Sequence, residues 1–104
     1  MNTTHQLLDT NAASVTVGTT VIKPARLRDE QGLFQVYLPA GFAGTVSLYG
    51  RLAPDAPWHE ITNQVIGDMV VNNTNTVVVD MFPEVSVGLA GNSTAAQVEA
   101  WLMT

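Results

Sequence analysis

The segment Gly44–Ile61 reads GTVSLYGRLAPDAPWHEI and decides the fold. Its first half alternates apolar and polar residues, which is the period of a half-buried β-strand. The residues expected to face inward are Val46, Leu48, Gly50 and Leu52. Two prolines flank Asp55, and proline has no N–H to donate to a strand ladder, so Ala53–Pro57 is predicted to be a turn. Trp58 and Ile61 resume the apolar pattern, which predicts a second strand and an indole that closes one end of the core.

Short alternating runs recur on both sides of this hairpin. The runs predicted to be strands are Ser14–Val17, Thr20–Lys23, Leu33–Leu38, Glu84–Leu89 and Ala95–Met103. Their inward residues include Phe34, Val36, Leu38, Val85, Val87, Leu89, Ala96, Val98, Ala100 and Leu102. A helix is the alternative for the alanine-rich Ala95–Met103, because alanine has the highest helix propensity. Its strict alternation favours a strand.

The middle of the chain has less regular patterns. Thr62–Val71 contains apolar pairs around Gly67–Asp68, which predicts two short strands joined by a turn. Asn72–Asn75 is predicted to be another turn, because asparagine tolerates the left-handed region and bonds to its own backbone. The run Val77–Val79 lacks alternation, which is typical of a central strand covered on both faces.

These runs amount to about seven to nine short strands separated by turn signals. The pattern predicts an all-β protein, a single antiparallel β-sandwich of immunoglobulin-like or jelly-roll-like form over residues 13–104. Residues 1–12 are polar apart from Leu7 and Leu8 and show no sustained period. They therefore predict an extended N-terminal arm, in which the two leucines reach a neighbouring subunit.

Composition limits the classes of function. The 104 residues have the usual size of one domain, and the absence of cysteine excludes disulfides and thiolate metal sites. Only 12% of the residues are charged, against roughly 25% in soluble domains, so part of the exterior is expected to be covered by a partner. A net charge of −5 with four basic residues argues against nucleic-acid binding. No signal-peptide pattern or membrane-length apolar run occurs, so no membrane association is predicted.

No catalytic, cofactor or metal site is predicted. His59 lies beside Glu60, but neighbours on a strand point to opposite faces and cannot easily meet at one substrate. His5 is too distant in sequence to form a metal-ligand pattern with His59. An acid/base pair such as Asp55 and Glu60 stays open, since that chemistry needs two carboxylates about 5–10 Å apart. The expectation is a non-enzymatic protein without a cofactor.

Several residues are candidates for contact with a partner. Three aromatic residues fall on the less apolar faces of their strands: Tyr37, Tyr49 and Trp101. They are interpreted as anchors of a subunit interface, as core of the second sheet, or as a platform for sugar rings. Ala25–Gly32 carries Arg26 and Arg28 and is expected to be a solvated loop closed by Gly32. The alternative is a contact patch in which both arginines reach carboxylates on a partner.

Two parts of the chain resemble small β-sandwich proteins of tailed bacteriophage particles. One is the hairpin that contains VSLYG at Val46–Gly50, followed by Asp55 and Trp58. It is similar to a hairpin of those proteins in which a strand is followed by Gly-Ser-x-Asp-Gly and then by Trp. The other is FPEVSVGLAGN at Phe82–Asn92, followed by VEAWL at Val98–Leu102. It is similar to their closing pair of strands, in which Phe-Pro-x-Val-x-Val precedes Gly-Asn and a terminal strand.

The resemblance covers Gly44–Leu102 and implies a virion structural protein, in particular a capsid decoration or cement protein that binds the outer surface of the head and stabilises it. It implies as partners other copies of the chain, for example in a trimer, and the major capsid protein. The chain would be made in the host cytoplasm. The alternatives are a minor tail, neck or baseplate component and a carbohydrate-binding module. The expected interface residues are Leu7, Leu8, Arg26, Arg28, Tyr37, Tyr49 and Trp101.

Overall fold

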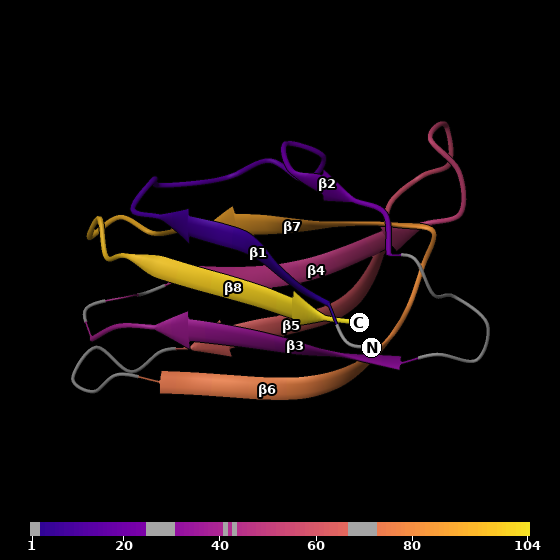
Figure 1. The fold of residues 1–104 in the computed structure, drawn as a ribbon. Coiled ribbons are helices and arrows are strands. Elements are labelled where there is room, and N and C mark those ends of the chain that lie inside the picture. The colour runs from indigo at the N-terminus through magenta and orange to yellow at the C-terminus, as the bar shows by residue number, and fades with distance from the viewer. Residues whose placement is uncertain (1–2, 25–30, 41, 43, 67–72) are drawn as a thin grey trace.

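Two four-stranded antiparallel sheets packed face to face form the structure, a computed structural model that describes residues 3–24, 31–40, 42, 44–66 and 73–104 (Figure 1). The prediction of an all-β antiparallel sandwich is confirmed. Sheet A has the strand order β1–β8–β3–β6, with bounds Thr4–Thr10, Val98–Met103, Gln31–Leu38 and Asn73–Asp80. Sheet B has the order β2–β7–β4–β5, with bounds Val21–Ile22, Glu84–Ala90, Gly44–Arg51 and His59–Ile66.

The core lies between the sheets and follows the predicted alternation. The inward residues of β3, β4, β7 and β8 are buried, and Val98–Met103 is a strand rather than a helix. Phe34 and Phe42 are the bulkiest fully buried side chains. The buried apolar residues are Leu7, Leu8, Phe34, Val36, Leu38, Phe42, Val46, Leu48, Val79, Val85, Val87, Leu89, Val98, Ala100 and Leu102. Burial of such side chains is the main source of stability in a domain without disulfides.

The N-terminal segment is a strand of the sandwich, so the expectation of an arm over residues 1–12 is wrong from Thr4 to Thr10. This segment, β1, pairs with β8, and Leu7 and Leu8 are only 4% and 5% exposed. The register shifts between Gln6 and Leu8, so the strand contains a bulge. A bulge places one extra residue in the strand, which lets two consecutive leucines face the core. That interruption of the period made the segment look unstructured in sequence.

Strand β6 lies at the edge of sheet A, so the prediction of a central strand is wrong. Val78 is 61% exposed, although Val79 is buried. The turn predicted at Asn72–Asn75 is wrong from Asn73 onward, because these residues pair with the end of β3. β5 continues to Ile66, so the first of the two short strands predicted within Thr62–Val71 is the end of β5. The turn predicted at Gly67–Asp68 lies outside the described residues.

The connection between β4 and β5 is the predicted proline-containing turn, and the N–H of Ala56 donates to the carbonyl of Ala53 at 3.0 Å. Two residues differ from expectation. Leu52 was expected to face inward, but β4 ends one residue earlier and Leu52 is 73% exposed. Trp58 lies outside the core cluster and is stacked 4.1 Å from the guanidinium carbon of Arg51.

Gly32, which was expected to close a loop, is a buried residue of β3. A Cβ at this position would lie 2.6 Å from the carbonyl oxygen of Met103, so only glycine allows the close approach of β3 to β8. Residues 25–30 of the predicted loop lie outside the described part of the chain.

A cluster of hydrogen bonds closes one end of the sandwich around Asn92, which is 1% exposed. Its Nδ2 donates to the carbonyls of Ala12 at 3.0 Å and Ala96 at 2.8 Å, and its Oδ1 accepts from the N–H of Ala96 at 3.2 Å. Its own N–H donates to the carbonyl of Ala13 at 3.1 Å. One amide side chain therefore holds together the segments that follow β1 and precede β8.

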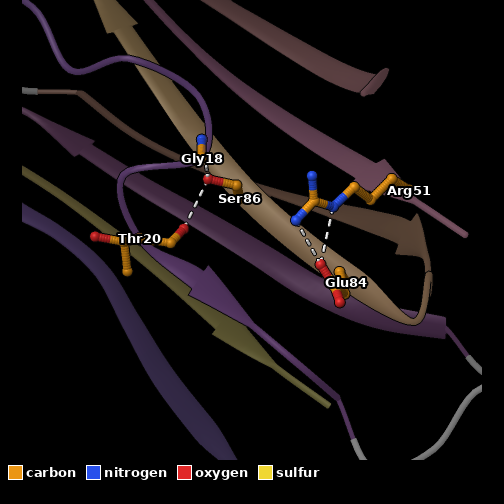
Figure 2. A network of polar contacts seen from close by, with 5 residues as sticks. All are labelled: Gly18, Thr20, Arg51, Glu84 and Ser86. Carbon is orange, nitrogen blue, oxygen red and sulfur yellow. Dashed lines mark hydrogen bonds and ion pairs between the residues drawn. The ribbon is translucent and has the colours of Figure 1, made fainter. Parts of the chain in front are cut away.

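The loop between β1 and β2 is fastened to β7 through Ser86, which is fully buried. The Ser86 hydroxyl accepts from the N–H of Gly18 at 2.9 Å and donates to the carbonyl of Thr20 at 2.7 Å (Figure 2). Gly18 has a φ of 98°, a conformation that glycine adopts without strain.

Replacing Ser86 by alanine is expected to lower the free energy of unfolding by about 1–2 kcal/mol, because two backbone groups lose their partner. Chemical denaturation measures this loss. Ser93→Ala is the matched control, since Ser93 is exposed and should change stability by less than about 0.5 kcal/mol. Equal stability of the two variants would contradict a fastening role of Ser86.

Candidate interaction surface

The part of the outer face of sheet B that lies over β7 is covered by its own chain. Val15 forms a bridge with Leu89, and the loop that follows folds over the outward residues of β7. A Cβ at Gly88 would lie 2.8 Å from Cγ2 of Val17 and 3.4 Å from Cε1 of Tyr49. Tyr49 is half-buried and lies against β7 beside this loop.

Below this loop, two charged side chains of sheet B neutralise each other. Nη2 and Nε of Arg51 each lie 2.8 Å from Oε1 of Glu84 (Figure 2). The Glu84 side chain is 7% exposed and that of Arg51 is 19% exposed. The guanidinium also stacks on the ring of Trp58. The two charges pair with each other within the fold, so neither is free to bind a ligand.

The outer face of sheet A, in contrast, is open. The strand registers place Leu33 between Met103 on β8 and Val78 on β6. In the next row, Gln35 lies between Trp101 and Thr76. Leu33 is 37% and Val78 61% exposed, and no described segment crosses this face (Figure 1). The residues Leu33, Val78, Trp101 and Met103 are called the outer strip below.

A shallow groove of about 270 Å³ lies within this face. Its lining residues are Thr4, Leu33, Gln35, Thr76, Trp101 and Met103. Trp101 is half-buried in the groove, so one part of its indole is held by neighbours and the other is accessible. Tryptophan in such a setting is the residue type most enriched among interface hot spots.

The charges that border the outer strip are acidic. Asp9 and Glu99 are direct cross-strand neighbours at one end of sheet A. Asp80 lies at the other end, where Oδ1 accepts from Nε2 of Gln31 at 3.3 Å. The two described basic side chains, Lys23 and Arg51, belong to other parts of the fold. Like charges placed directly opposite are unfavourable, so a basic partner would stabilise this arrangement.

The residues predicted to form an interface are distributed over the whole molecule. Tyr37 and Trp101 lie together on the outer face of sheet A, whereas Tyr49 lies on sheet B. Leu7 and Leu8 are in the core, and Arg26 and Arg28 lie outside the described residues. The sequence reasoning missed Leu33, Val78 and Met103. Only the register of β3 with its two neighbours brings these residues into one row.

A second hollow, of about 290 Å³, lies at the end of the sandwich beside the β4–β5 turn. Its lining residues are Gly50, Arg51, Leu52, Ala56, Pro57, His59 and Phe82. The imidazole of His59 stacks on Phe82 with 5.8 Å between ring centroids. Glu60 is the next residue on the same strand and pairs with Tyr49, whereas His59 pairs with Gly50. This hollow brings no second catalytic group to the imidazole.

In the described part of the chain, no group of three or more acidic or histidine side chains could hold a metal ion. No helix that could span a membrane occurs among the described residues either. Comparisons of the chain with protein-family models, with curated proteins and with solved structures gave no match. The outer face of sheet A is the feature of the described fold best suited to contact another molecule.

Proposed function

We propose that the chain is a non-enzymatic structural protein of a tailed bacteriophage particle, a decoration or cement protein that binds the outer surface of the head and stabilises the shell. The observation that carries this proposal is the open outer face of sheet A, with an apolar strip and no covering segment among the described residues. The resemblance of the segment Gly44–Leu102 to small phage sandwich proteins supports the same function.

The open face of a sheet can bind the outer surface of a shell. Full burial of an apolar side chain contributes about 1.5–3 kcal/mol, and less for side chains that are already half-buried, such as Trp101 and Met103. One copy would therefore bind weakly. On a shell with many equivalent sites, linked copies bind more tightly, because each further contact is effectively intramolecular. Weak single contacts are compatible with a protein that coats a lattice.

The acidic border defines the chemistry of the partner. Asp9, Glu99 and Asp80 would lie against basic side chains of the major capsid protein, around an apolar centre that faces the outer strip. Such charges mainly set orientation and association rate, and their effect weakens at high salt. Attachment to the head should therefore weaken as ionic strength rises.

The direct test is the copy number of the chain in purified particles of the phage that encodes it, measured by quantitative mass spectrometry. A ratio near unity to the most abundant shell protein, or a simple fraction of it, is expected for a decoration protein. A ratio of a few per cent would place the chain in the tail, neck or baseplate. Absence from particles would contradict the proposal.

Replacing Trp101 by alanine is expected to weaken attachment to undecorated heads roughly tenfold or more, as truncation of an interface hot spot does. Co-sedimentation of the purified variant with the heads measures the change. Leu52→Ala is the matched control, because Leu52 is exposed on the β4–β5 turn, outside sheet A. Equal binding of both variants would show that the outer face of sheet A is not the contact.

A carbohydrate-binding module is the second candidate, favoured by one observation. Trp101 lies in a groove beside the polar side chains of Gln35, Thr76 and Thr4, and an aromatic face with polar neighbours is suited to stack on a sugar ring. A glycan screen in which binding is lost on Trp101→Ala, together with absence from particles, would favour this function.

A further inference from the structure

The four edge strands of the sandwich differ in how they are protected from pairing with other chains. An edge strand presents unpaired N–H and C=O groups, and natural proteins block such edges with bulges, short strands, charges or proline. Edge strand β1 contains the bulge at Leu7. Edge strand β2 has only two residues and is followed by Lys23 and Pro24. Both edges on this side of the molecule are therefore blocked.

On the opposite side, β5 is blocked as well. Its pairing with β4 passes from Thr62 directly to Glu60, so Ile61 is an extra residue and forms a bulge. The strand also begins with His59 and Glu60, two ionisable side chains that are both exposed. A bulge twists an edge, and charges disfavour the approach of another strand.

Edge strand β6 has none of these features. Its 8 residues pair with β3 in unbroken register, from Asn73 opposite Leu38 to Asp80 opposite Gln31. The sequence NTNTVVVD contains no proline or basic residue, and its single charge is at the last position. Val78 is 61% exposed on the outer face. Long, uncharged edges rich in β-branched residues are templates for strand addition.

We propose that β6 pairs with β6 of a second copy of this chain, antiparallel across a two-fold axis perpendicular to sheet A. The two four-stranded sheets then form one continuous sheet. Outward residues must pair with outward residues across such an axis, because paired residues in a sheet share a face. With Val77 at the axis, Thr76 lies opposite Val78 of the second copy, and Asp80 lies opposite its Thr74.

The placement of the single charge is what favours a second copy in this orientation. In a parallel, in-register pair the two Asp80 carboxylates would be neighbours, which is unfavourable. In the antiparallel pair each carboxylate lies opposite a threonine hydroxyl, which can donate a hydrogen bond to it. An antiparallel two-fold contact also closes after two copies, which is the commonest form of homo-oligomer. This contact therefore makes a dimer rather than a trimer.

This inference does not depend on the proposed function. The dimer nevertheless has a consequence for the proposed function. A two-fold axis perpendicular to the sheet keeps both outer strips on the same side of the dimer. The dimer would then present one apolar surface about twice as long as the outer strip of a single copy, with Val78 of each copy near the contact between the two β6 strands. Such a surface can make two contacts to a repeating partner at once.

Size-exclusion chromatography with light scattering and sedimentation velocity test the dimer with purified chain at several concentrations. The wild-type chain is expected to be a dimer. Val78→Lys is expected to raise the dimer dissociation constant roughly tenfold or more, because it places a charge at the contact between the two β6 strands. Leu52→Lys is the matched control, since Leu52 is also largely exposed but lies on a turn. Circular dichroism and thermal unfolding check that both variants fold.

A second variant separates edge pairing from association through the outer face. Gln35→Lys places a charge in the middle of this face, on β3, and is expected to leave the dimer intact. Loss of the dimer in Gln35→Lys would mean that two copies pack face to face, which would overturn the proposal. A monomeric or trimeric wild-type chain would overturn it as well.

The absence of native cysteine allows a clean crosslinking experiment. Thr76→Cys is expected to be linked between the two copies by a short thiol-reactive crosslinker, because the two residues lie diagonally across the proposed axis, about 7–8 Å apart. Thr4→Cys is the control, since Thr4 is exposed on β1, at the other edge of the same sheet. Crosslinking of Thr4→Cys and not of Thr76→Cys would contradict the proposed edge.

Discussion

Replacing Arg51 by methionine is expected to lower the free energy of unfolding by about 3 kcal/mol. The substitution keeps most of the apolar side-chain volume but removes the cation that lies 2.8 Å from the Glu84 carboxylate. Because the Glu84 side chain is only 7% exposed, its charge would stay in a nonpolar setting without compensation. Loss of one partner of a buried ion pair typically costs about 3–5 kcal/mol, and the partial exposure of Arg51 favours the lower end.

Denaturant unfolding of three variants identifies the cause of this loss. Arg51→Lys keeps the positive charge and should lose distinctly less stability than Arg51→Met. The double variant Arg51→Met with Glu84→Met removes both charges and should recover much of the loss, since a buried pair often gives little net stability over apolar residues. If Arg51→Met and the double variant are equally destabilised, the lost packing against Trp58, and not the unpaired carboxylate, is the cause.

Replacing Asn92 by alanine is expected to lower the free energy of unfolding by about 3 kcal/mol. The side chain is buried and bonds to three backbone groups, the carbonyls of Ala12 and Ala96 and the N–H of Ala96. Each buried polar group left without a partner costs about 1–3 kcal/mol, and water that enters the vacated space offsets part of the sum. Thermal and denaturant unfolding measure the change.

Asn92→Asp gives the sharper test, because it changes one atom and introduces a pH dependence. The Oδ1 acceptor is kept, but an ionised carboxylate would face the carbonyls of Ala12 and Ala96. Burial beside these carbonyls raises the pKa of the introduced carboxyl group in the folded state. The stability deficit relative to the wild-type chain is therefore smallest below the unfolded pKa of about 3.9, and it grows as the pH rises toward the folded value. A deficit that is the same at pH 4 and pH 7 would contradict the buried contacts of Asn92.

The parts of the fold that follow a period of two could be predicted from the sequence. In β3 and β8 buried and more exposed residues alternate, because one face of each strand lies on the core and the other on the open face of sheet A. In β7 the inward valines are buried as predicted, but Glu84 and Ser86 on the opposite face are buried as well. The proline-flanked turn at Asp55 was also predictable, because proline cannot donate to a ladder. Here local sequence and tertiary contacts agree.

Elements whose environment depends on distant residues were not predictable. The bulge in β1 removes the alternation at Leu7 and Leu8, and only pairing with β8 shows where they point. The valines of β6 read as a buried strand, yet their strand has a neighbour on one side only. The asparagines at the start of β6 favour a turn by propensity, but their pairing with β3 overrides it. β-Propensity depends on context in this way.

The candidate site was predictable only in part. Tyr37, Tyr49 and Trp101 could be placed on outer faces by alternation. Which outer face stays open depends on the loop around Gly18, which folds over sheet B and is held by Ser86. No pattern in the loop itself indicates which sheet it covers.

The pairing of the first strand with the last also has a consequence for the order of folding. β1 ends at Thr10 and its only strand partner, β8, begins at Val98. At about 5–20 residues per second, the ribosome delivers this partner roughly 4–18 s after β1. Until then, part of the packing is missing around Leu7, Leu8 and the inward face of β3, because β8 is absent. The sandwich therefore closes only after β8 has been synthesised, and ribosome-bound nascent chains that lack β8 should be sensitive to protease and be bound by chaperones.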